Sequence, residues 1–134
     1  MYKNILVPVA LDHERDVTTA LGIAQSLASE GATITALTVV EAVPNYVMAG
    51  FPENQAERNR SAALEALKAE LGASPAKPVV VTGHAARSIL DYAEGHGVDC
   101  IVIASHRPGF QDFFLGSTAA RVVRHANCAV HVVR

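Results

Sequence analysis

This chain of 134 residues has few cysteines, no long apolar run and almost no excess charge. Its two cysteines, Cys100 and Cys128, lack the partners at short spacing that a metal or redox site requires, and we interpret them as small core residues in a reducing compartment. No apolar run approaches the roughly 20 residues of a membrane helix. No signal peptide is recognisable before the first apolar run, so we expect a cytoplasmic protein without a membrane partner.

The formal net charge is −2 and the sequence pI is about 6.3, which gives no general attraction to nucleic acid or to anionic membranes. The basic residues are scattered, apart from Arg121, Arg124 and His125, which we interpret as the solvated face of a helix. His84 is interpreted as a surface histidine. The sequence also lacks a complete Gly-x-x-x-x-Gly-Lys-Ser phosphate loop and a paired set of carboxylates, so neither of those catalytic chemistries is indicated.

Half of the residues are apolar and the mean hydropathy is +0.22, as expected for one globular domain spanning residues 1–134. Apolar runs rich in β-branched residues predict five strands, at 5–11, 33–40, 79–81, 101–103 and 129–133. Apolar residues at helical spacing predict four helices, over 15–29, 53–71, 86–94 and from Gly116 onward. This alternation predicts an α/β fold whose parallel strands are joined by right-handed crossovers.

Two boundaries carry specific expectations. Pro8 lacks an N–H and would interrupt a strand ladder, so it marks the carboxyl end of the first strand. Gly31 is expected to cap the first helix at its carboxyl end.

The last third of the chain brings one strand end and one helix start together. The apolar run 101–103 stops at the small, polar and cationic segment 104–109. Ser117 and Thr118 then open a helix and are expected to cap its free N–H groups. Those N–H groups and the helix dipole can hold an anion, which Gly116 would allow to approach closely. The buried side of this helix is predicted to carry Ala119, Val122, Val123 and Ala126.

These residues carry a family resemblance. The segments ASHRP and LGSTAARVVRHANCAVHVVR resemble the nucleotide-binding part of the universal stress proteins, and are closest to the F/G-type subgroup. The likeness extends to YKNILVPV, LTVVEAVP and VVVTGHAARSILDYAEGHGVDCIVIAS, which together cover nearly the whole chain in the family's order. The resemblance implies a single doubly wound, five-stranded parallel sheet in the order 3-2-1-4-5, of the adenine nucleotide alpha hydrolase-like class.

The resemblance also implies a site. In relatives, the loop after the first strand contacts the base and ribose through its backbone, and Val39 falls where a side chain lies against adenine. The family motif has two glycines where this chain has Ala104 and Arg107. Eight residues separate Arg107 from Gly116, which is one fewer than in the usual family motif and equals the spacing in the F/G-type subgroup. The implied nucleotide-binding residues are Pro8, Val9, Ala10, Val39, Ile103, Ala104, Ser105, His106, Arg107, Gly116, Ser117 and Thr118.

The expected ligand is ATP, with AMP or another adenine nucleotide as the alternative. The Arg107 guanidinium can form two hydrogen bonds with phosphate oxygens. This pairing would compensate for the loop at 104–109 being less open than one with glycine at these positions. The competing interpretation is that Arg107 is a surface cation. Many relatives carry an Asp at the position of Ala10, where it helps to hold ribose or a metal. The next acid is Asp12, so the need for Mg²⁺ is left open.

Three functions are compatible with the sequence. The first is an ATP-binding regulatory protein of the stress response that acts as a dimer. The second is an A-type universal stress protein that binds no nucleotide and serves as a protein-interaction module. The third is an ATPase or phosphotransferase that uses His106, which has no orienting partner close in sequence. We favour the first and expect no enzyme activity beyond slow, incidental ATP hydrolysis.

The final strand, residues 129–133, is expected at an edge of the sheet, where an open side invites pairing with another chain. Relatives dimerise by pairing this strand with its twofold mate, so the resemblance implies a homodimer. The loop 41–52 is unusually apolar, and it is a candidate for a lid, for local packing or for a contact that joins two dimers into a tetramer.

Overall fold

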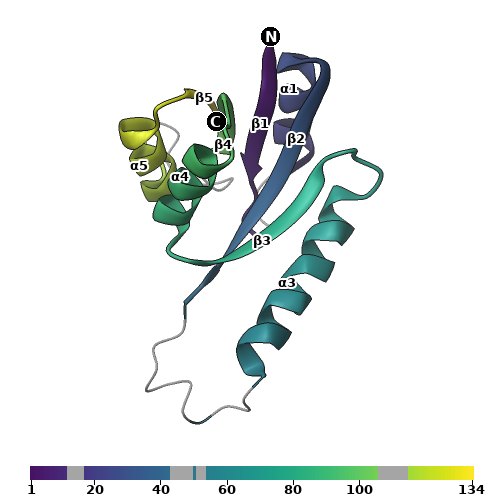
Figure 1. Ribbon diagram of the computed structural model, residues 1–134, viewed down its shortest axis with the longest axis vertical. Helices are drawn as coiled ribbons and strands as arrows, with labels where there is room; N and C mark the ends of the chain where they lie inside the picture. The colour runs from purple at the N-terminus through teal and green to yellow at the C-terminus, as the bar shows by residue number, and fades with distance from the viewer. Residues whose placement is uncertain (12–16, 43–49, 51–53, 106–114) are drawn as a thin grey trace.

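The computed structural model describes residues 1–11, 17–42, 50, 54–105 and 115–134. Strands and helices alternate along these residues (Figure 1), as β1 (Tyr2–Pro8), α1 (Val17–Leu27), β2 (Ala28–Glu41), α3 (Gln55–Leu71), β3 (Lys77–Gly83), α4 (Ala85–Gly95), β4 (Cys100–Ala104), α5 (Ser117–His125) and β5 (Ala129–Val133). All strand pairs are parallel, and the strand order is β3-β2-β1-β4-β5. The predicted doubly wound sheet in the order 3-2-1-4-5 is confirmed.

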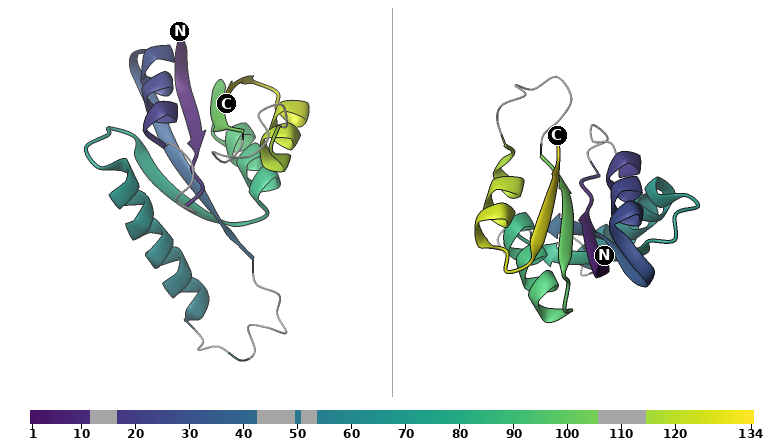
Figure 2. Two further views of the ribbon diagram at one scale, coloured as in Figure 1. Left: turned by 180° about the vertical axis from the view of Figure 1, so that it is seen from behind. Right: turned by 90° about the horizontal axis from the view of Figure 1, so that it is seen from above.

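The central strand β1 is buried on both of its faces, because each face of the sheet is covered by helices. Ile5 and Val7 belong to a core with α1 and α3, whereas Leu6 belongs to a second core with α4 and α5. All three side chains are fully buried. The view from above in Figure 2 shows α4 and α5 on one side of the sheet and α1 and α3 on the other. The unbroken apolar run therefore arises because alternate side chains of a strand enter different cores.

Each covering helix turns a narrow stripe of small or aliphatic residues toward the sheet. In α4 the buried positions are Ala86, Ile89 and Ala93, at spacings of three and four residues. In α5 the buried positions include Val122, whereas Val123 is 45% exposed. The prediction that Val123 lies on the buried side is therefore wrong, because one residue further along a helix turns the side chain by about 100°.

The boundary between α1 and β2 also differs from the prediction. The helix ends at Leu27 and the strand begins directly at Ala28, so Gly31 is not a helix cap. It lies within β2 with φ of +77°, where the register of β2 against β1 shifts. A positive φ favours glycine, and an irregular register accommodates the extra residues. By contrast, β1 ends at Pro8, as its missing N–H predicted, so the strand stops short of the full predicted run 5–11.

The Asp99 side chain holds the amino end of β1 through hydrogen bonds. Its carboxylate accepts hydrogen bonds from the backbone N–H groups of Lys3, at 2.9 Å, and of Asn4, at 3.0 Å. Burial tends to raise the pKa of Asp99, but these backbone hydrogen bonds and the Lys3 charge outweigh it, so the pKa lies below its ordinary value. The amino ends of β1 and β4 are thus held together at the edge of the sheet opposite their carboxyl ends.

The two cysteines pack as small apolar residues. Cys100 is buried in the core on the α1 side, whereas Cys128 is half-buried against the core on the α4 side. Burial raises the pKa of the Cys100 thiol to about 11, which keeps it in the unreactive thiol form near neutral pH. Among the described residues, no helix combines the length and apolarity that crossing a membrane would need.

Candidate functional site at the carboxyl edge of the sheet

The site begins where β1 and β4 separate. Their ladder ends with Leu6 opposite Ile101, whereas β1 stays paired with β2 as far as Pro8 and β4 stays paired with β5 as far as Ala104. Each strand therefore continues with its outer neighbour while the two central strands diverge. In open α/β sheets this switch point, at the carboxyl ends of the strands, is where ligands bind.

A cavity of about 140 Å³ occupies this opening. Six of the predicted site residues line it, namely Pro8, Val9, Ala10, Val39, Ile103 and Thr118. Three residues that the sequence did not single out complete the lining, namely Leu37, Ala85 and Ile89. The structure thus brings the corner after β1, the ends of β2 and β4 and the starts of α4 and α5 to one place.

The corner after β1 is held by hydrogen bonds within the protein. The N–H of Val9 donates to the carbonyl of Leu37 at 2.8 Å, and the hydroxyl of Thr38 donates to the carbonyl of Val9 at 3.0 Å. Val9 and Thr38 are 6% and 4% exposed, so water competes little for these bonds. This wall of the cavity is therefore fixed before any ligand arrives.

The end of β4 and the start of α5 are in direct contact. The N–H of Gly116 donates to the carbonyl of Ser105 at 2.7 Å, and the N–H of Ser105 donates to the carbonyl of Val133 at 2.9 Å. A Cβ at position 116 would overlap the carbonyl oxygen of Ser105. Glycine is therefore needed at 116 for close approach to the protein's own backbone, rather than for an unusual φ, which is −58°.

Four further predicted residues lie at this junction, beside the cavity lining rather than within it, namely Ala104, Ser105, Gly116 and Ser117. Two others, His106 and Arg107, lie outside the described residues, as do Asp12 and most of the loop 41–52.

The amino end of α5 lacks the cap that the sequence predicted. Gly116 is the N-cap residue, and no described side chain makes a capping hydrogen bond there. Ser117 and Thr118 lie inside the first turn, one and two positions too late for a hydroxyl to act as N-cap. The first N–H groups of α5 are therefore not capped by the hydroxyl of either residue. With the helix dipole they form a site for an anion.

The described lining is almost entirely apolar. It consists of aliphatic side chains and proline, with the Thr118 hydroxyl as its one side-chain polar group, and it includes no titratable residue. Its volume is below the roughly 300–1,000 Å³ of complete small-molecule sites, and matches a single ring system better than a whole nucleotide. No group of three His, Cys, Asp or Glu residues within the described ranges could hold a metal ion.

The three additional lining residues could be found only in part from the sequence. Leu37 lies two residues before Val39 on one strand, so period-2 alternation places both on the same face. Ala85 and Ile89 are four residues apart on α4, which gives them a common helix face. Which element that face meets depends on how the helix packs, and the sequence alone carried no signal for that.

Comparison with known proteins shows a consistent likeness over the whole chain. The model of the family described as "Universal stress protein family" matches residues 1–134. Universal stress protein A homolog 2 of Coxiella burnetii is 32% identical over 140 residues, covering 99% of this chain and 95% of the relative. Universal stress protein G of Escherichia coli O157:H7 is 29% identical over 142 residues, covering all of both chains.

Solved structures share the fold. Universal stress protein UspA from Lactobacillus plantarum has a TM-score of 0.68 at 30% identity, over 99% of this chain and 98% of that one. A universal stress protein in complex with cAMP has a TM-score of 0.60 at 20% identity, over 99% and 97% of the two chains. One from Archaeoglobus fulgidus in complex with dAMP has a TM-score of 0.56 at 20% identity, over 99% and 98%.

Proposed function

Because this chain belongs to the universal stress protein family, we propose that it is a regulatory protein of the stress response that binds an adenine nucleotide at the carboxyl edge of its sheet. The observation that carries the proposal is the ring-sized apolar cavity next to the amino end of α5, whose N-cap is a glycine. Neighbours of the same fold solved with cAMP and dAMP support the ligand class.

In this proposal the two halves of the nucleotide meet two different surfaces. The purine ring enters the cavity against Val39 and Ile103, where burial of its faces provides affinity without charge. The ribose lies at the corner formed by Val9 and Ala10. The phosphates lie at the first turn of α5, where N–H groups and the helix dipole favour negative charge.

Arg107 is proposed to complete the site by pairing with phosphate oxygens, together with Ser105, His106 and Ser117. ATP is the proposed ligand, and AMP or another adenylate would use the same cavity with fewer phosphate contacts. We propose no catalytic role for any of these residues, because the described lining carries no base or nucleophile and His106 has no orienting partner close in sequence. The competing function, an interaction module without nucleotide, predicts that the cavity stays empty in solution.

Titration with a fluorescent ATP analogue tests this proposal. Arg107→Ala is expected to weaken binding roughly ten- to a hundredfold, because a charge-assisted hydrogen bond contributes about 1.5–3 kcal/mol. Arg124→Ala is the matched control, since Arg124 lies on the exposed side of α5 and lines no part of the cavity. Affinity weaker than millimolar would instead favour the interaction module, and equal, tighter affinity for wild type and the Arg107→Ala variant would show that Arg107 does not pair with the phosphates.

We also propose that the protein is a cytoplasmic homodimer formed through β5. This strand pairs with β4 and lies at the edge of the sheet, which leaves its outer side open within the described residues. Val130 and Val132 are half-buried against the α5 side, and His131 alternates with them and is exposed. Light scattering at micromolar concentration is expected to give the mass of two chains, or of four if a further contact joins two dimers. A monomer would contradict the proposal.

A further inference from the structure

A second, larger cavity lies between α4 and α5 and shares no lining residue with the nucleotide cavity. Its volume is about 480 Å³, within the roughly 300–1,000 Å³ of small-molecule sites. Four basic side chains line it, His84 and Arg87 from the α4 side and Arg121 and His125 from α5. Two helices that pack on the same face of the sheet therefore turn cationic residues toward one space.

The positive charge of this groove is only partly balanced. Asp91 lines it as well and forms an ion pair with Arg87, at 3.5 Å between carboxylate oxygen and Nε. Both side chains are largely exposed, so this pair contributes little to stability and can open to a ligand. Arg121 has no ion-pair partner in the part of the chain that the structure describes.

The basic residues follow helical spacing, so their convergence is a property of the two helices. Arg121 and His125 are one turn apart on α5, and Arg87 lies three residues after His84 at the start of α4. All four are exposed, whereas the core beneath them is formed by other residues. Core packing therefore does not explain why these basic residues are present. A helix face that is merely solvated needs charged residues, but it does not need cations that converge on one cavity with those of a second helix.

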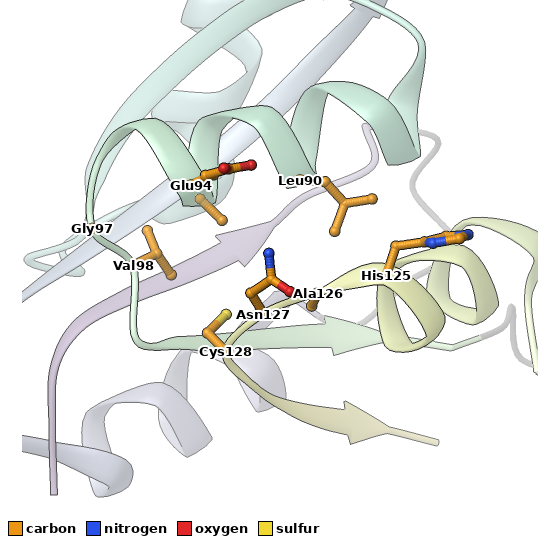
Figure 3. Close-up of a pocket in the computed structure, with 9 residues that line it drawn as sticks. Leu90, Glu94, Gly97, Val98, His125, Ala126, Asn127 and Cys128 are labelled. Carbon is orange, nitrogen blue, oxygen red and sulfur yellow. The ribbon is translucent and has the colours of Figure 1, made fainter.

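At one end the groove continues into a cavity of mixed lining, in which Leu90, Val98 and Ala126 are apolar and Glu94, His125 and Asn127 are polar. Leu90 and His125 line both the larger cavity and a smaller one of about 150 Å³, so the two are adjacent. Figure 3 shows the side chains of this smaller cavity, with Leu90 and Glu94 on α4 facing the segment that carries Ala126, Asn127 and Cys128. A ligand with its charge beside Arg121 could place an apolar body here.

We propose that the α4–α5 groove binds a small organic anion, in which a phosphate or carboxylate is attached to an apolar body. The anion pairs with Arg121 and Arg87, and the apolar body covers Leu90 and enters the smaller cavity. A cavity of this volume, lined by residues of two neighbouring helices only, favours a small molecule over an acidic peptide. Because the groove and the nucleotide cavity share no lining residue, both sites can be occupied together.

Binding of 1-naphthyl phosphate to ¹⁵N-labelled protein, followed by amide chemical shifts, tests this proposal in the presence and absence of saturating ATP. We expect saturable shifts at His84, Leu90 and Arg121 in both conditions. Arg121→Gln is expected to weaken the affinity about tenfold, the effect of losing one charged contact. Arg124→Gln removes the same charge from α5 outside the groove and is expected to change the affinity less than twofold.

Several results would overturn the proposal. Equal losses in the Arg121→Gln and Arg124→Gln variants would show general attraction to a basic helix face. Displacement of the probe by ATP, or shifts confined to Val9 and Thr118, would place the probe in the nucleotide cavity. Equal affinity for uncharged 1-naphthol would show that the groove recognises no anion. Because the shifts report location, these outcomes remain distinct even if the protein binds no nucleotide.

Discussion

Gly116→Ala is expected to lower the free energy of unfolding by about 1–3 kcal/mol, the usual cost of forcing extra volume into a packed site. The added Cβ would overlap the carbonyl oxygen of Ser105, which cannot withdraw because Ser105 is 1% exposed and its N–H is bonded to Val133. The start of α5 must therefore move away from the end of β4. We also expect nucleotide affinity to fall at least tenfold, because the phosphates are proposed to lie at the first turn of that helix.

Gly22→Ala is the matched control. A Cβ at Gly22, within α1, has no heavy atom within 4 Å. Alanine is a better helix former than glycine, so this variant is expected to raise stability by about 0.5–1 kcal/mol and to leave nucleotide affinity unchanged. Chemical denaturation and nucleotide titration of both variants make the comparison. Unchanged stability in Gly116→Ala would show that the β4–α5 junction is looser than the structure indicates.

Val39→Phe is expected to reduce affinity for adenine nucleotides at least a hundredfold with little change in melting temperature. The phenyl ring can extend into the 140 Å³ cavity and would occupy the space proposed for the purine. An aromatic ring buries on the order of 150 Å², which at about 25 cal/mol per Å² corresponds to about 4 kcal/mol, so excluding the purine costs most of its affinity. The fold is spared because the ring fills empty space and displaces no core residue.

Val123→Phe controls for the added aromatic surface. Val123 is 45% exposed on α5 and lines neither the nucleotide cavity nor the α4–α5 groove. We expect this variant to bind nucleotide like the wild type in calorimetric titrations. If Val39→Phe bound nucleotide with wild-type affinity, the base could not lie where we propose, even if another part of the protein bound the phosphates.

The sequence predicted the sheet well because a run of consecutive apolar residues indicates a strand that is buried on both faces. Ile5, Leu6 and Val7 form one apolar run, and a strand with such a run must be covered on both faces. Pro8 marked the end of β1 because a residue without an N–H cannot continue a ladder. The strand order came from the family resemblance, since periodicity does not specify which strands are neighbours.

Local details that depend on packing were harder to predict. Val123 fits the apolar spacing of α5, but the helix turns only one side toward the sheet, and its orientation is set by contacts with other elements. Ser117 and Thr118 look like caps, yet the helix begins one residue earlier, at an N-cap glycine that the close approach to Ser105 requires. The α4 residues that line the cavity could not be predicted either, because the sequence does not specify which face of α4 meets the end of the sheet.

The most direct test of the central claim is an amide chemical-shift titration of the wild-type protein with ATP. The account predicts saturable binding with the largest shifts at Val9, Ala10 and Thr118, where the corner after β1 and the first turn of α5 face the cavity. Absence of binding up to millimolar ATP, or saturable shifts confined to His84 and Arg121 in the α4–α5 groove, would contradict it.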